Sequence, residues 1–176
     1  MSSPSRKVAG AAGENARVLR AGLVAGVLDL CLALGIQFLV AGRVSLVRIL
    51  QAIAAGVLGP ASREGGLSAA LLGLVAHFVI ATIWAALWFF AATRSVQLRR
   101  FTHRRETLVA CGLAYGVVVW MGMNLLVVPA SRAPSNLTFT LVTALMIVGH
   151  ALLVGLPIVW TIGAVRHPND DAILAL

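Results

Sequence analysis

The chain has 176 residues, of which 60% are apolar and only 11% are charged, and its mean hydropathy is +0.94. A water-soluble domain carries about a quarter charged residues, so this composition excludes a globule in water and indicates a protein that lies mainly in lipid. The net charge of +8 does not indicate nucleic-acid binding, because the basic residues stand in short clusters beside long apolar runs, where anionic lipid headgroups are their expected partners.

Four apolar runs are long enough to cross the bilayer, because a helix needs about 20 residues to span roughly 30 Å of hydrocarbon. Before them lies a small, polar segment, residues 1–18, which we expect to be a disordered cytoplasmic N-terminus. Residues 19–166 form a single transmembrane domain, and residues 167–176 form a cytoplasmic tail. The sequence predicts an all-α, integral membrane four-helix bundle with spans at about 21–41, 67–92, 108–129 and 139–165.

The first span follows Arg17 and Arg20, as the apolar core of a secretory signal would. This core is longer than the roughly 7–15 apolar residues of a signal and contains Asp29, so we predict a span that is not cleaved. Cys31 in this span and Cys111 in the third imply no disulfide framework. We expect both cysteines to pack as small apolar side chains.

Between the first two spans lies VSLVRILQAIAAGVLGP, residues 44–60, an apolar stretch that carries Arg48 and Gln51. Ser45 suits an N-cap and a Gly-Pro pair suits a stop, which predicts an additional short helix over 45–58, about 20 Å long at 1.5 Å per residue. Because this is too short to cross, we expect the helix on the extracytoplasmic side, either interfacial or re-entrant. Arg48 and Gln51 share one helix face and form a candidate outer-side polar layer, which faces either water or the mouth of the bundle.

Lysine and arginine counts set the orientation. With four spans, ten of the 14 basic residues fall on one side of the membrane and four on the other, including five arginines between the second and third spans on the richer side. The positive-inside rule therefore predicts a multi-pass protein of the bacterial cytoplasmic (inner) membrane with both termini in the cytoplasm. An Asn-x-Thr sequon at 136–138 falls on the predicted outer side, where so short a motif most often arises by chance.

Pro157 lies inside the fourth span, whereas Pro129 lies at the end of the third, where stopping a helix is unremarkable. A proline within a helix supplies no N–H to the carbonyl four residues earlier. We therefore expect a kink at Pro157, supported by the neighbouring Gly155, with polar neighbours satisfying the freed carbonyl.

Ionisable residues inside membrane spans are rare and indicate function by default. Asp29 and His77 each fall within a stripe of small residues, which favours the bundle interior over lipid. Counted at about 1.5 Å per residue, Asp29, His77 and His150 come near the midplane, and Asn124 comes nearer the outer side. We predict a buried polar cluster of these four side chains, with the outer-side polar layer within reach of Asn124.

Three roles are open for this cluster. It can hold the helices in register through hydrogen bonds, or it can handle protons or a solute, since an imidazole beside a carboxylate exchanges protons near neutral pH. Alternatively, His77 and His150 can ligate haem or a divalent metal. Against haem stands the lack of an attachment motif, and against a metal stand the positions of the two cysteines, so we predict no cofactor.

Five stretches between residues 20 and 165 are distinctive: AGLVAGVLDL, VRILQAIAAGVLG, GLVAHF, MNLLVVP and HALLVGLPIVW. Together they resemble a family of uncharacterised bacterial four-span inner-membrane proteins that is distantly YagU-like. The resemblance implies a loose association with acid resistance. It also implies that the polar residues within these stretches are motif positions: Asp29, Arg48, Gln51, His77, Asn124 and His150.

Two functions of different classes follow. The chain lacks a soluble domain and a recognisable catalytic set, so we do not expect an enzyme. The function that the sequence favours is a non-enzymatic membrane subunit or scaffold, packed against a partner complex or a second copy. The alternative is a small transporter or proton-responsive permeation element that uses the midplane Asp/His cluster, with the short helix as an outer lid. A haem- or metal-binding membrane subunit is a further alternative.

Overall fold

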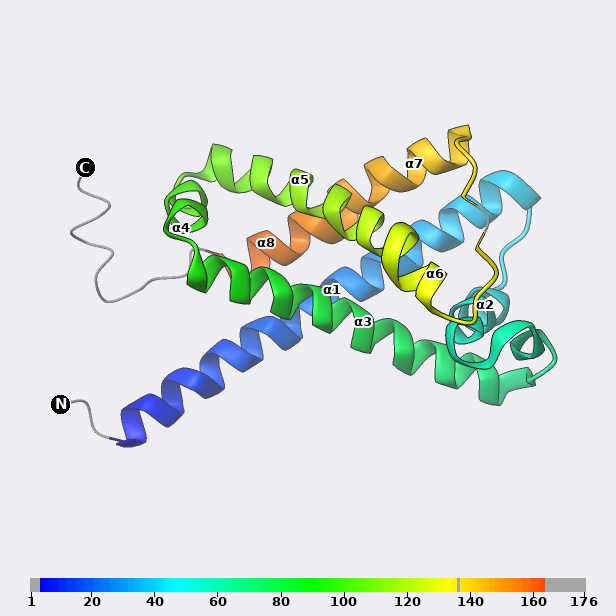
Figure 1. Ribbon diagram of the computed structural model, residues 1–176, viewed down its shortest axis with the longest axis horizontal. Coiled ribbons are helices and arrows are strands. Elements are labelled where there is room, and N and C mark those ends of the chain that lie inside the picture. Colours follow the sequence, from blue (N-terminus) through cyan, green and yellow to red (C-terminus); the bar gives the residue numbers. More distant parts are fainter. Residues whose placement is uncertain (1–3, 136, 164–176) are drawn as a thin grey trace.

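The computed structural model describes residues 4–135 and 137–163 (Figure 1). These residues form helices and connecting loops, and no strand occurs among them. Four continuous helical stretches are long and apolar enough to cross a membrane, which confirms an all-α fold with four candidate spans. They are Ala12–Ala41, Gly66–Arg94, Arg105–Ala130 and Leu141–Ile162.

The first helix, α1 (Pro4–Ala41), begins well before the first predicted span. We expected residues 1–18 to be disordered, and the structure instead has helix from Pro4 onward. Proline suits the first turn of a helix, and the alanine-rich segment after it can continue a helix that the apolar span stabilises. The predicted tail at 167–176 and the sequon's Asn136 lie outside the described residues.

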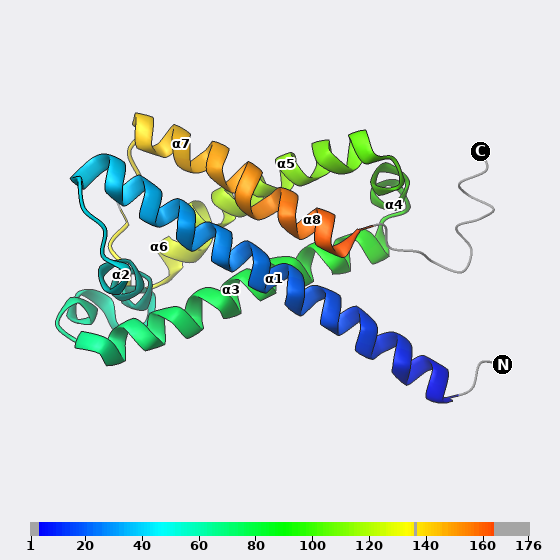
Figure 2. The same cartoon turned by 180° about the vertical axis from the view of Figure 1, so that it is seen from behind.

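A short helix, α2 (Leu46–Leu58), lies where α1 ends and α3 (Gly66–Arg94) begins (Figures 1 and 2). We call this part of the bundle the α2 end. The Ser45 side chain caps α2 by accepting a hydrogen bond from the backbone N–H three residues on. Gly59, at a φ of +69°, ends α2 in a conformation that favours glycine and opens the 3-10 helix η1 (Gly59–Arg63). The chain thus turns back at the α2 end, and α2 does not cross to the opposite end of the bundle.

At the opposite end, which we call the α4 end, α4 (Val96–His103) joins the second and third spans (Figure 1). The sequence analysis treated this arginine-rich segment only as a loop. The Ser95 side chain caps α4 by accepting a hydrogen bond from the Leu98 N–H at 3.2 Å. A polar connection of this length can therefore still form two turns of helix.

The third and fourth spans each contain one turn of π-helix. In chain order the elements are α5 (Arg105–Gly122), η2 (Met123–Val127) and α6 (Val128–Ala130), then α7 (Leu141–His150), η3 (Ala151–Gly155) and α8 (Leu156–Ile162). Pro129 follows η2 by two residues, and Pro157 follows η3 by two residues. A π turn is one way in which a helix adjusts its hydrogen bonding, and here both prolines stand directly after such an adjustment.

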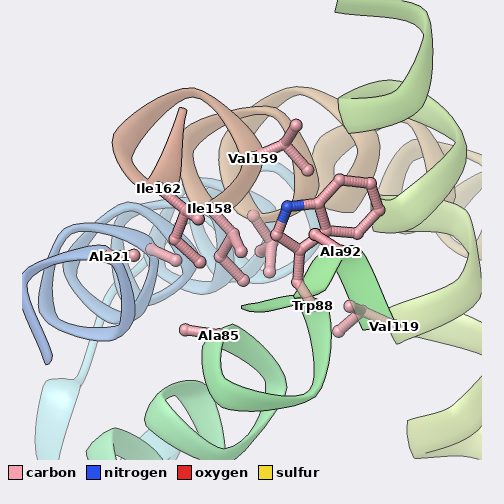
Figure 3. Packing of buried hydrophobic residues seen from close by; sticks show 10 residues of the cluster. Ala21, Ala85, Trp88, Ala92, Val119, Ile158, Val159 and Ile162 are labelled. Carbon is pink, nitrogen blue, oxygen red and sulfur yellow. The ribbon is translucent and has the colours of Figure 1, made fainter. Parts of the chain in front are cut away.

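Buried apolar side chains fill the half of the bundle nearer the α4 end, where α1 packs against α3 and α8. Figure 3 shows Trp88 of α3 directed towards side chains of α8, with Ala21 of α1 and Ala85 of α3 beside them. Ala21, Ala85 and Ile158 are completely buried. We call this close-packed region the core.

Candidate ligand-binding cavity

A cavity of about 750 Å³ lies in the half of the bundle nearer the α2 end. Its walls come from all four spans, from α2 and from the segment that joins α6 to α7. Most of the lining side chains are apolar, among them Ile49 and Ile53 of α2 and Ile80 of α3. Ala25, Val119 and Val154 belong both to the lining and to the core, so the core forms the floor of the cavity.

The four residues of the predicted buried cluster all line this cavity. Asp29 comes from α1, His77 from α3, Asn124 from η2 and His150 from the last position of α7. The two histidines are buried, with 9% and 8% of their surface exposed, and Asn124 is half-buried. The structure therefore brings together residues that are up to 121 positions apart (150 − 29) in the sequence.

His77 does not bond to Asp29. Its Nε2 lies 2.8 Å from the backbone carbonyl oxygen of Gly26, one turn before Asp29 on α1. A carbonyl only accepts hydrogen bonds, so this ring nitrogen carries the hydrogen. The contact is possible because α1 and α3 lie close together: a Cβ at Gly26 would meet the Phe78 ring at 2.8 Å. His77 thus joins α1 to α3 and keeps Nδ1 as its second ring nitrogen.

His150 makes one hydrogen bond and one longer contact. Its Nδ1 donates to the carbonyl oxygen of Met146, 2.8 Å away in the same helix, and its Nε2 lies 3.6 Å from Oδ1 of Asp29. Because Nδ1 carries the hydrogen, Nε2 of a neutral ring presents a lone pair to the carboxyl group. The pair is attractive only when one proton lies on Asp29 or on His150 Nε2. With one proton on either group, this contact joins α1 to α7.

Asn124 is placed like His150. Its Nδ2 donates to the Trp120 carbonyl oxygen at 2.9 Å, again four residues earlier in the same helix. Each of these polar side chains therefore stands where an α-helix passes into a π turn and bonds a carbonyl of the preceding turn. The sequence analysis did not foresee this shared geometry, although a proline six residues after the start of each π turn marks both places.

Arg48 and Gln51 lie outside the cavity. Arg48 Nη1 donates to the Arg63 carbonyl at 3.4 Å, and Gln51 Nε2 donates to the Gly66 carbonyl at 3.0 Å. Both partners stand where η1 passes into α3, so the structure does not join the predicted outer-side polar layer to Asn124. Gln51 is buried and Arg48 is exposed, and α2 turns its apolar face into the cavity.

Aromatic residues also form the site. Trp84 and Trp120 line the cavity. The Tyr115 hydroxyl donates to the Trp84 carbonyl at 2.5 Å, and the Tyr115 ring contacts Trp88, with ring centroids 4.9 Å apart. This aromatic group connects α3 to α5 at the level where the cavity meets the core.

No group of three or more His, Cys, Asp and Glu side chains that could hold a metal ion occurs within residues 4–135 and 137–163. Haem or metal ligation by His77 and His150 stays a prediction. No protein-family model, no curated protein and no solved structure matches the chain. The resemblance to YagU-like proteins likewise stays a prediction, and the functional argument rests on the cavity.

Proposed function

We propose that the protein is a small membrane permeation element whose solute site is the cavity of the α2 half. One observation carries this proposal: a half-open space of about 750 Å³ brings together one carboxyl group, two imidazoles and one amide from separate helical elements. Ligand sites in proteins have this character, with mostly apolar walls, a few convergent polar groups and volumes of roughly 300–1,000 Å³. These four polar residues are Asp29, His77, Asn124 and His150, and the hydroxyl groups of Ser131, Thr138, Thr140 and Thr143 line the space beside them.

A scaffold subunit is the function that the sequence alone favoured, and we place it second. Exposed apolar side chains such as Leu39 and Phe90 suit a partner protein, and they suit lipid equally well. A scaffold needs close packing between its helices, whereas interior space forfeits dispersion contacts. The cavity is therefore a feature that a binding or permeation function explains and that a scaffold does not.

We place the α2 end on the extracytoplasmic side of a bacterial inner membrane. The α4 end carries the arginines of the segment that joins the second and third spans, and the positive-inside rule assigns such a cluster to the cytoplasm. Anionic lipid headgroups are the partners that we propose for the exposed Arg104 and Arg105. In this orientation α2 lies at the outer interface, packed on α3, and the cavity is reached from outside.

The experiment fills the cavity with a larger side chain and compares this variant with a matched control on the same helix. Ala33 lines the cavity and Cys31 is exposed two residues away. We expect the purified protein in detergent to bind N-phenyl-1-naphthylamine, a neutral apolar fluorophore, saturably, as measured by energy transfer from tryptophan. Ala33→Phe should weaken this binding at least tenfold, and Cys31→Phe should leave it within twofold. Equal binding by both variants and the wild type would contradict the proposal.

A further inference from the structure

We propose that the cavity takes an organic cation and that this cation exchanges with the proton held between Asp29 and His150. The inference rests on the proposed function and names the substrate class and the coupled ion of the same site. It is based on which hydrogen-bond donors and acceptors of the polar side chains already have partners and which are left for a solute.

Three of the polar side chains donate hydrogen bonds to backbone carbonyls. Nε2 of His77 donates to Gly26, Nδ1 of His150 donates to Met146, and Nδ2 of Asn124 donates to Trp120. What they leave over are two acceptors, His77 Nδ1 and Asn124 Oδ1, neither of which has a hydrogen-bond partner within the described parts of the chain, together with the Asp29 carboxylate that faces His150 Nε2. A site whose unused groups are acceptors and one acid favours a positively charged solute over an anion.

The walls favour an organic cation over an inorganic one. Calcium and magnesium need about six oxygen ligands, with carboxylates prominent among them, and here Asp29 is the one carboxylate in the lining, beside one amide and four hydroxyl groups. Trp84 and Trp120 supply aromatic surface, and an organic cation gains both from burial against it and from the negative face of an indole ring. The Asp29 carboxylate, 26% exposed, supplies the opposite charge.

The exchange balances in charge. Without solute, Asp29 and His150 hold one proton between them and the pair has no net charge. When a monovalent cation binds beside the Asp29 carboxylate, the proton leaves His150 Nε2 for water, the ring becomes neutral, and the net charge of the site is again zero. The titratable groups that line the cavity are Asp29 from α1, His77 from α3 and His150 from α7. The lining residues of α2, α5 and η2 add no titratable group.

The test compares two ions of the same shape and opposite charge. Tetraphenylphosphonium should bind the wild type in detergent at least ten times more tightly than tetraphenylborate. Its apparent Kd should fall about tenfold per unit rise in pH where the free site holds the proton and the occupied site does not, since one proton then leaves per cation. Calorimetry in two buffers of different ionisation enthalpy counts that proton directly.

Asp29→Asn should weaken tetraphenylphosphonium binding at least tenfold, a larger loss than it causes for neutral N-phenyl-1-naphthylamine, and Cys31→Phe on the same helix should leave cation binding within twofold. Circular dichroism reports whether each variant is folded. The proton count on the wild type needs no variant and decides the question if Asp29→Asn does not fold. Equal binding of both ions, or cation binding without proton release, would overturn this inference and leave the cavity proposal intact. Absence of any binding by the neutral probe would instead refute the cavity proposal itself.

Discussion

The two halves of the helical bundle use small residues in opposite ways. In the α4 half, glycines bring backbones into direct contact: a Cβ at Gly155 would lie 2.1 Å from the Gly116 nitrogen, and a Cβ at Gly112 would lie 2.8 Å from the Leu156 Cα. In the α2 half, Gly73 brings α3 against α2, since a Cβ there would lie 1.9 Å from the Leu50 carbonyl oxygen, but Ala33 and Ala76 border open space. The same residue types therefore close the α4 half and the contact between α2 and α3, and they leave room at the cavity.

The difference shows what a stripe of small residues means in a membrane helix. Small side chains permit close approach, and whether it occurs depends on what faces them. The two π turns lie at the boundary between the halves. There η3 contacts α5 through Gly155, His150 stands directly before η3, and Asn124 is the second residue of η2. The polar cluster stands where close packing ends, which is where a solute can reach it.

The largest effect should come from adding one methyl group to the closed half. Gly155→Ala forces a Cβ against backbone atoms of α5 on two sides, 2.1 Å from the Gly116 nitrogen and 2.3 Å from the Gly112 oxygen. Overpacking of this kind costs about 3 kcal/mol, and backbone neighbours cannot rotate away. Gly35→Ala is the control, because nothing lies within 4 Å of its Cβ, and it should stabilise the helix by up to about 1 kcal/mol. Unfolding in mixed micelles, followed by circular dichroism, measures both, and a similar effect at the two sites would refute the comparison.

The second effect compares two alanines on α3. Ala85 is completely buried in the core, whereas Ala76 lines the cavity. Ala85→Leu should cost about 2 kcal/mol, because the larger side chain displaces packed neighbours. Ala76→Leu places the same atoms in open space, so it should change stability by less than about 1 kcal/mol. If the same unfolding assay gave equal losses, the two halves would not differ in packing.

The sequence predicted the four spans well because lipid restricts which backbone structures are possible. Lipid leaves no alternative to helices for a chain of this composition, so hydropathy and length were sufficient to predict the four spans. The stretch before the first span was the exception. There, composition suggested disorder, while α1 extends to Pro4 because a stable helix can propagate into an alanine-rich neighbour.

The sequence predicted which polar residues form the candidate site, but it did not predict which of them contact one another. Depth along each helix follows from counting residues, and it placed Asp29, His77 and His150 at one level. Which side chain meets which depends on helix rotation, which a π turn changes by a fraction of a turn. Hence His77 bonds the Gly26 backbone, and His150 is the histidine that pairs with Asp29. A proline within or at the end of a span was the available signal for such a shift.

The third effect tests that rotation. Pro157→Ala supplies an N–H that can bond the Leu153 carbonyl, which allows η3 to relax into α-helix. Removing the shift turns His150 relative to α8 by up to about 100° and moves it away from Asp29. We expect tetraphenylphosphonium binding to weaken about fivefold while stability changes by less than about 1 kcal/mol. Pro134→Ala, in an exposed loop, is the control and should alter neither. Unchanged cation binding in Pro157→Ala would show that the π turn does not position the site.

The smallest effect should come from the polar residue whose bond is local. Asn124 donates to the Trp120 carbonyl, which also accepts the Met123 N–H, so Asn124→Ala leaves no carbonyl without a partner. Stability should therefore fall by no more than about 0.5 kcal/mol. His77→Ala breaks a bond between two helices and should cost more, about 1 kcal/mol. If Asn124→Ala proved the costlier change in the same unfolding assay, the hydrogen bond within one helix would hold the bundle more strongly than the bond across it, which would contradict this order.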